Sequence, residues 1–142
     1  YGLEGFSLNV LDKRQTLTEK LISLIRFSLS ENYIYDLASK IRHFYDLHYL
    51  FQDEECVNYL QSEQFKIDFN SLLEHDRETF DKPNGWSSLD IKQSPLLSDF
   101  PAIWSSLKGT YLKELPAIAF SEIPSEDAVA KSFEQIVYQI VK

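Results

Sequence analysis

The sequence contains few of the residues that form disulfide bonds, zinc sites or phosphate-binding loops. Its 142 residues include a single cysteine, Cys56, together with four glycines and no methionine. One cysteine excludes an intramolecular disulfide bond and a zinc site built from several cysteines. The glycines stand apart, at positions 2, 5, 85 and 109, so they form no glycine-rich loop that could cradle a phosphate group.

The histidines and serines also lack the spacing of the common metal and hydrolytic sites. No His-Glu-x-x-His motif occurs, and His43, His48 and His75 do not have the spacing of metal ligands. No serine lies in the strand–turn–helix context of a nucleophile elbow. We therefore predict no metal site from the residues of this chain.

Long hydrophobic runs are missing as well. No segment approaches the ~18 apolar residues that a membrane helix requires, and no signal-peptide pattern opens the chain. We expect a soluble protein, most simply cytoplasmic, with no membrane partner. Because the chain begins at Tyr1 and contains no methionine, we also expect it to be part of a longer protein.

The composition that remains is that of a globular domain rich in aromatic rings. Hydrophobic residues make up 44% of the chain and charged residues 25%, which argues against disorder. The length is close to that of one domain, so we expect a single domain over residues 1–142. Ten Phe, eight Tyr and two Trp predict a core of large rings.

The net charge of −8 is spread unevenly. Residues 1–50 carry six Lys or Arg against six Asp or Glu, whereas residues 51–142 carry eight against sixteen. A nucleic-acid-binding protein is expected to have a basic stripe, and the longer, acidic part has the opposite character. Any contact with phosphate must then come from the cations of the first part: Lys13, Arg14, Lys20, Arg26, Lys40 and Arg42.

Hydrophobic periodicity predicts a mainly α fold with a short strand at its start. Residues 6–11 alternate as in a half-buried strand. Thr16 and Glu19 have the spacing of a capping box, which predicts that a first helix begins at 17 and ends near 29. We expect a bundle of five to six helices over residues 16–142, preceded by a strand or linker over 1–15. The later helices are predicted at 33–52, 53–61, 62–81, 99–114 and 125–141, with a long loop at 82–98 and a linker between Pro116 and Pro124.

Candidate functional groups lie on the first two predicted helices. Lys20 follows the capping box, where a lysine and a helix N-terminus together favour an anion, although it is also compatible with a surface ion pair. Arg42 and Asp46 are four residues apart and so lie on one helix face. This spacing is compatible with a simple surface ion pair or with an aspartate that is held in place for catalysis. His48 falls on the apolar stripe, which favours a histidine packed in the core.

Two segments of the chain resemble a known family. The segment Thr16-Leu-Thr-Glu-Lys-Leu-Ile-Ser-Leu24 and the segment Lys40-Ile-Arg-His-Phe-Tyr-Asp-Leu-His-Tyr-Leu50 are similar to the two motif helices of nucleotidyltransferase toxins of the AbiEii/AbiGii type. Looser similarity continues in order through residues 94–97, 109–111 and the final helix. The resemblance therefore covers nearly the whole chain and is most specific over residues 16–50.

The resemblance implies that the chain is the helical, C-terminal part of a nucleotidyltransferase fold. In that family an upstream domain carries a D-x-D pair that holds Mg²⁺, and this sequence contains no such pair. By resemblance, Asp46 is a catalytic residue and Lys20, Arg26 and Arg42 bind the nucleotide. The full-length protein is expected to use Mg²⁺ and an NTP, while this chain alone is expected to be inactive.

The same resemblance implies a toxin of a bacterial toxin–antitoxin pair tied to phage defence by abortive infection. The expected reaction transfers a nucleotide from an NTP to RNA, such as tRNA, or to a protein, and the expected partners are the upstream domain, a cognate antitoxin and the acceptor. Neither the NTP, the acceptor nor the oligomeric state follows from the sequence.

Two other hypotheses stay open from the residues. Arg42 and His48 match the loose R-x(4–6)-H motif of HEPN ribonucleases, which are small helical bundles that cleave RNA without a metal. A helical interaction module without catalysis is the third hypothesis, favoured by the missing metal-binding carboxylates. The first hypothesis requires Asp46, the second requires His48, and the third requires neither.

Overall fold

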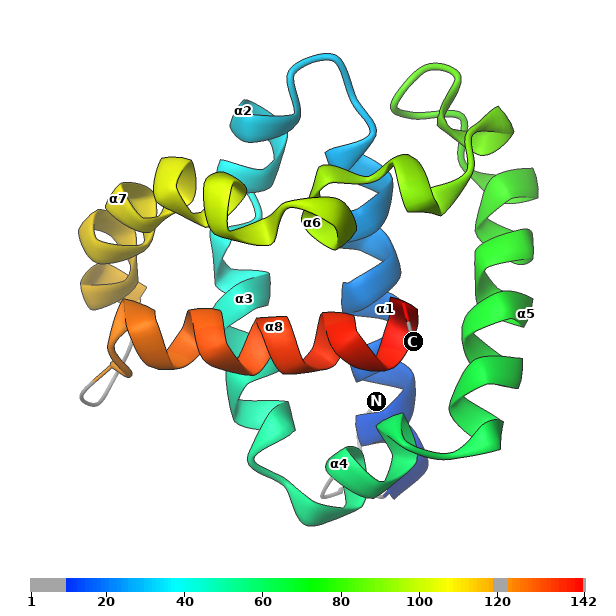
Figure 1. Ribbon diagram of the computed structural model, residues 1–142, viewed down its shortest axis with the longest axis horizontal. Helices are drawn as coiled ribbons and strands as arrows, with labels where there is room; N and C mark the ends of the chain where they lie inside the picture. The colour runs from blue at the N-terminus through cyan, green and yellow to red at the C-terminus, as the bar shows by residue number, and fades with distance from the viewer. Residues whose placement is uncertain (1–9, 119–122, 142) are drawn as a thin grey trace.

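The computed structural model describes residues 10–118 and 123–141, which form eight α-helices and no strand (Figure 1). The mainly α prediction is therefore confirmed. None of the described helices has the length and apolarity to cross a membrane. The helices are α1 (Val10–Ser28), α2 (Tyr33–Ala38), α3 (Ile41–Phe51), α4 (Glu54–Leu60), α5 (Glu63–Thr79), α6 (Pro95–Ser98), α7 (Phe100–Ile118) and α8 (Glu126–Val141).

Helix α1 is the central element of the bundle. It packs against α2, α3, α4, α5 and α6, and in Figure 1 it lies behind α8, between α3 and α5. Its inward residues are fully buried: Leu17, Leu21, Ile22, Leu24 and Ile25. Burying a leucine or isoleucine side chain contributes about 1.5–3 kcal/mol, so these five residues anchor the fold around α1.

Aromatic rings hold α3, α7 and α8 together, as the composition predicts. The ring of Phe44 on α3 lies 5.5 Å from that of Trp104 and 5.1 Å from that of Phe133, measured between centroids. The rings of Phe100 and Phe133 are 4.7 Å apart. Tilted contacts at these distances are the favoured geometry for aromatic pairs. The contacts hold α3 against both α7 and α8.

The polar tips of two core aromatics are also satisfied. Trp104 donates its indole N–H to a carboxylate oxygen of Glu126 at 2.7 Å. Tyr111 donates its hydroxyl to the backbone carbonyl of Pro124 at 2.7 Å, and its ring is fully buried. Burial raises the pKa of Tyr111 to about 12. Both bonds join α7 to the start of α8.

The beginning of α1 corrects the sequence prediction. Of the predicted strand over 6–11, residues 6–9 lie outside the described residues, and 10 and 11 belong to the helix. The capping box is wrong, because Thr16 lies inside α1 and Glu19 accepts a hydrogen bond from the Gln15 side chain at 2.9 Å. Thr18 likewise donates its hydroxyl to the Arg14 carbonyl within the helix.

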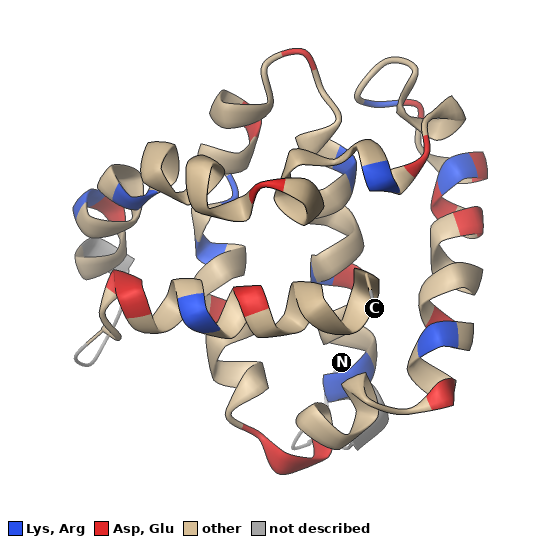
Figure 2. Cartoon of the chain, viewed as in Figure 1, with Lys and Arg blue, Asp and Glu red and all other residues tan. Residues whose placement is uncertain are grey.

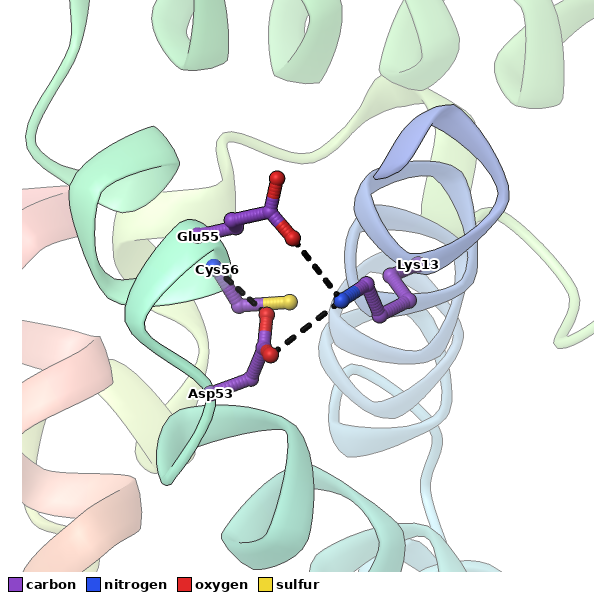
Figure 3. A network of polar contacts seen from close by, with 4 residues as sticks. All are labelled: Lys13, Asp53, Glu55 and Cys56. Carbon is purple, nitrogen blue, oxygen red and sulfur yellow. Dashed lines mark hydrogen bonds and ion pairs between the residues drawn. The ribbon is translucent and has the colours of Figure 1, made fainter. Parts of the chain in front are cut away.

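Ionic contacts tie the first turns of α1 to α4. The Lys13 ammonium lies 3.1 Å from a carboxylate oxygen of Asp53 and 3.1 Å from one of Glu55 (Figure 3). Asp53 also accepts a hydrogen bond from the Cys56 backbone N–H and so caps α4. The hydrogen bonds that Lys13 donates, first to Glu55 and then to Asp53, raise its pKa. The contact stabilises helical turns that local sequence signals did not predict.

A short break divides the helix predicted over 33–52. The Ser39 hydroxyl donates to the Asp36 carbonyl at 2.6 Å, and the Lys40 N–H donates to the Leu37 carbonyl at 2.9 Å. Lys40 itself is non-helical, with φ −116° and ψ 27°. A serine that bonds to nearby backbone competes with the helical ladder, so α3 starts on a new axis at Ile41.

The remaining helices follow the predicted ranges closely, with two corrections. Asp53, Ser62 and Ser125 accept backbone N–H bonds at the starts of α4, α5 and α8, where the pattern predicted helix starts. The predicted loop over 82–98 contains two single 3₁₀ turns and α6. Pro116 lies inside α7, which continues to Ile118, so it does not open the predicted linker.

Candidate functional site

One face of α3 gathers most of the predicted site residues. Arg42, Tyr45, Asp46 and Tyr49 are spaced at i, i+3, i+4 and i+7, which places them on a continuous stripe of the helix. The buried residues of α3, Ile41, Phe44 and Leu47, face the core instead. The stripe therefore stands beside a rigid core and remains reachable from outside.

Helix α1 supplies the cation that meets this stripe. The Lys20 ammonium lies 3.0 Å from Oδ2 of Asp46. The structure thus brings together two of the four residues that the resemblance names, across 26 positions of sequence. Lys20 lies in the middle of α1 and not in a first helical turn, so the interpretation as an anion site at a helix N-terminus is wrong, and the alternative of an ion pair with a carboxylate is confirmed.

The Lys20–Asp46 ion pair is partly open to solvent. The two side chains are 23% and 25% exposed. Pairs in such surroundings contribute about 0–1 kcal/mol, because water competes for both charges. The pair can therefore open at little cost when a stronger anionic partner reaches the lysine.

Arg42 adds a second cation beside Asp46. Its Nε lies 3.8 Å from Oδ1 of Asp46, and its side chain is 61% exposed. A guanidinium offers five donors in a planar fork, and this one is mostly exposed to solvent. Arg42 therefore presents a second, accessible cation next to the Asp46 carboxylate.

His43 lies within the electrostatic field of this cluster, and no motif predicted it as a site residue. Burial first, and then the charges of Lys20 and Lys40, lower its pKa to about 4 against the opposing effect of Asp46. The imidazole is consequently neutral at physiological pH. Its place next to Arg42 in the sequence was the only signal that could have found it.

Two tyrosines extend the stripe from Asp46. The rings of Tyr45 and Tyr49 meet edge to face, with centroids 5.0 Å apart, and Tyr49 is 46% exposed. Burial is the main cause that raises the pKa of Tyr45, so its phenol stays protonated near neutral pH. The stripe therefore offers aromatic surface and hydroxyl groups next to the two cations.

Arg26, the remaining predicted nucleotide-binding residue, lies elsewhere. Its guanidinium sits 4.3 Å from the centroid of the Phe80 ring and 5.8 Å from that of Trp86. It donates a hydrogen bond to the Lys82 carbonyl at 3.3 Å, and burial lowers its pKa. The structure does not bring Arg26 to Lys20 and Asp46; it uses Arg26 to hold the segment that follows α5.

His48 takes the role that its apolar position predicts. Its Nδ1 lies 2.8 Å from the hydroxyl oxygen of Ser132 on α8, and burial lowers its pKa. Arg42 instead pairs with Asp46, so the two residues of the R-x(4–6)-H pattern point to different neighbours. This geometry does not favour a ribonuclease site formed by Arg42 and His48.

Two other cations of residues 1–50, Lys13 and Lys40, are engaged within the fold. Lys13 pairs with Asp53 and Glu55 at the start of α4, an acidic turn at the lower end of Figure 2. The Lys40 ammonium lies 4.5 Å from the centroid of the Phe27 ring. Lys20 and Arg42 therefore remain as the cations that meet at one carboxylate.

The described residues do not fit a metal centre. In the ranges 10–118 and 123–141 no group of three or more His, Cys, Asp or Glu side chains lies close enough to hold a metal ion. Asp46 has two cations against it, which is the opposite of the acceptor cage that Mg²⁺ requires. We accordingly assign no metal ligand and derive no step through a metal in this chain.

The fold and the cluster define a helical domain in which a lysine, an arginine and an aspartate meet on adjoining helices. The chain belongs to the family described as nucleotidyl transferase AbiEii toxin, type IV toxin–antitoxin system, whose model matches residues 2–137. No curated protein and no solved structure matches the chain. Membership indicates a nucleotidyltransferase toxin with an antitoxin as its partner.

Proposed function

We propose that this chain forms the nucleotide-binding helical part of a nucleotidyltransferase, with the Lys20–Asp46 pair at its centre. The observation that carries the proposal is the 3.0 Å contact between Lys20 and Asp46, in a chain that belongs to a nucleotidyltransferase family. The metal-holding carboxylates are proposed to come from an upstream domain of a longer protein, together with the Mg²⁺ that such enzymes use.

Lys20 is the proposed ligand of the NTP triphosphate. Its pair with Asp46 is partly exposed and weak, whereas a triphosphate offers several charged oxygens. When the nucleotide binds, the ammonium exchanges Asp46 for phosphate, and Arg42 approaches the same group from its exposed position. Cations placed over developing phosphate charge are the main source of catalysis in phosphoryl transfer.

Asp46 is the proposed general base. Once Lys20 has turned to the phosphate, the carboxylate is free to accept the proton of an acceptor hydroxyl. The hydroxyl oxygen then attacks the α-phosphorus, a new phosphodiester bond forms, and pyrophosphate leaves with the electrons of the broken P–O bond. We propose RNA, such as tRNA, as the acceptor, with protein as the alternative.

A transfer assay tests the proposal. The full-length protein is incubated with labelled NTPs, Mg²⁺ and total RNA, as wild type and as the variants Lys20→Ala, Asp46→Asn, Arg42→Gln and His48→Ala. We expect label to join RNA or protein, to be lost in Lys20→Ala and Asp46→Asn, to fall in Arg42→Gln, and to persist in His48→Ala. Lys13→Ala is the matched control, because Lys13 is a second ion-paired lysine of α1 outside the cluster.

Other outcomes contradict the proposal in distinct ways. RNA cleavage without metal that is lost in His48→Ala alone indicates a ribonuclease. Transfer that survives both Lys20→Ala and Asp46→Asn places the chemistry outside this cluster. The absence of any activity in the wild type indicates a helical module that acts by contact.

The cellular role is proposed on the same family membership. We propose that the protein is a bacterial toxin that halts growth during phage infection and is held in check by an antitoxin. Induced expression should stop growth, co-expression of the antitoxin should restore it, and Asp46→Asn should be harmless. Growth arrest that persists with Asp46→Asn at equal protein levels contradicts this role.

A further inference from the structure

A second group of polar residues lines a groove on the other side of α1. The groove has a volume of about 770 Å³ and lies between α1, α4 and α5, a size typical of sites for small organic molecules. Its walls are Arg14, Gln15 and Thr18 from α1, Tyr59 from α4, and Gln64, Asp68, Ser71, Leu72 and His75 from α5.

The groove is separate from the Lys20–Asp46 cluster. At 3.6 residues per turn, Thr18 and Arg14 are separated from Lys20 by about 160° and about 120° around α1. The α5 residues of the groove recur at i, i+4, i+7, i+8 and i+11 from Gln64, which is one stripe of that helix. Two facing stripes are thus mainly polar where packed helices usually bring apolar side chains together.

Arg14 is the feature that points to a ligand. Its guanidinium lies 5.2 Å from the centroid of the Tyr59 ring, and its Nε is buried without a hydrogen-bond partner. No carboxylate pairs with it among the described residues. The Nε atoms of Arg26 and Arg77 also lack hydrogen-bond partners, but other nitrogens of these side chains donate hydrogen bonds. Arg26 donates to the Lys82 carbonyl, and Arg77 donates to the Glu74 carboxylate and the Leu89 carbonyl.

The carboxylate of the groove is engaged with other groups. Asp68 accepts a hydrogen bond from the Tyr59 hydroxyl at 2.5 Å and another from the Gln64 side chain at 2.8 Å. Arg14 is therefore left as a cation whose buried Nε has no hydrogen-bond partner, although a carboxylate lines the same groove. A guanidinium of this kind is suited to two parallel hydrogen bonds with a carboxylate or a phosphate.

We propose that this groove binds a small organic anion of mononucleotide size, whose carboxylate or phosphate group pairs with Arg14. The volume exceeds that of a bare inorganic anion, and the side chains of Gln15, Ser71 and His75 offer hydrogen bonds to the rest of the molecule. Leu72 adds apolar contact. The site is independent of the proposed transfer reaction and shares only α1 with it.

Titration calorimetry with the purified chain tests the proposal. The probes are AMP and UMP for the phosphate source, and citrate and glutarate for the carboxylate source, each up to about 10 mM, where even weak binding is detected. We expect at least one probe to bind, and Arg14→Gln to weaken it by about tenfold, since a charge-assisted bidentate contact is lost. Asp68→Asn should tighten binding, because it removes a negative charge from the groove.

Three further variants distinguish binding in this groove from binding at other cations of the chain. Arg77→Gln is the matched control, because Arg77 lies on α5 and pairs with Glu74; it should bind as the wild type does. Ser71→Trp should abolish binding by filling the groove, and it decides the question if Arg14→Gln fails to fold by circular dichroism. Lys20→Ala should leave binding unchanged.

The proposal is overturned by any of three results. The first is that no probe binds the wild-type chain, and the second is that neither Arg14→Gln nor Ser71→Trp affects binding. Alternatively, binding falls in Lys20→Ala but not in Arg14→Gln, which places the probe at the other cluster.

Discussion

His43 makes the stability of this protein depend on pH in a way that can be calculated. Burial and the charges of Lys20 and Lys40 lower its pKa from 6.5 to about 4. Below pH 6.5 the unfolded chain takes up a proton at this histidine, while the folded chain does so only near pH 4. The unfolded state then binds more protons, so the free energy of unfolding falls as the pH falls between these values.

The size of the effect follows from the shift. Going from about pH 7.5 to about pH 5, a group with these two pKa values costs about 2 kcal/mol of stability. His43 keeps partial contact with solvent, which screens the charges, so we expect about 1 kcal/mol from this residue. His48 has a lowered pKa of the same sign and adds to the total loss.

Urea denaturation at the two pH values measures the effect. Each protein is unfolded at about pH 7.5 and about pH 5, and the change in unfolding free energy is compared between wild type and His43→Gln, so that the variant's own loss at neutral pH cancels. We expect His43→Gln to lose about 1 kcal/mol less than the wild type over this interval. If both lose the same amount, the pKa of His43 is not lowered in the folded state and the reasoning is refuted.

Three other predictions concern the fold. Cys56 is fully buried, and its pKa is raised to about 11, mainly by burial. The thiol of the native protein should therefore resist iodoacetamide at about pH 8 and react once the chain is unfolded in urea. Rapid labelling of the native protein would contradict the burial of Cys56. Phe44→Ala removes the ring of α3 that contacts aromatic rings of α7 and α8. It should lower the free energy of unfolding, measured by urea denaturation, by about 3–5 kcal/mol. A loss below about 1 kcal/mol indicates that the aromatic cluster is not closely packed. Ser62→Ala removes the hydroxyl that accepts a hydrogen bond from the Phe65 N–H at the start of α5, and it should lower the free energy of unfolding by about 1 kcal/mol. Ser105→Ala, at an exposed position of α7, is its control and should change the free energy of unfolding little.

Capping residues in the sequence predicted the helix starts that depend only on neighbouring residues. Asp53, Ser62 and Ser125 each cap a helix within three residues of themselves, so the sequence around them was sufficient. Thr16 and Glu19 show the limit of such signals, because the same spacing also occurs inside a helix. The first turns of α1 are stabilised by the contact of Lys13 with Asp53 and Glu55, which lie about 40 positions away in the sequence. No local pattern reveals a contact at that separation.

The sequence named three of the residues that meet in the candidate cluster, but not their geometry. The resemblance named Lys20, Arg26, Arg42 and Asp46 together, yet all four could converge only if α1 presented both Lys20 and Arg26 to α3. Lys20 and Arg26 are six residues apart, which separates them by about 120° around the helix. Arg26 consequently packs against Phe80 and Trp86 beside α5, and of these two cations of α1 it is Lys20 that meets Asp46.

The two ion-paired lysines of α1 show how this helix can serve both structure and chemistry. Lys13 is held by two carboxylates of α4, so a single competing anion must displace both, which suits a fixed structural contact. Lys20 is held by one carboxylate that Arg42 also approaches, so Asp46 keeps a cationic neighbour when Lys20 turns away. Leu17 and Leu21 on α1 and Phe44 on α3 are fully or almost fully buried, so the two helices that carry the pair are anchored in the core. In the function that we propose, Lys20 changes partners by side-chain rotation while these helices stay in place, and Asp46 thus keeps its position when a triphosphate binds.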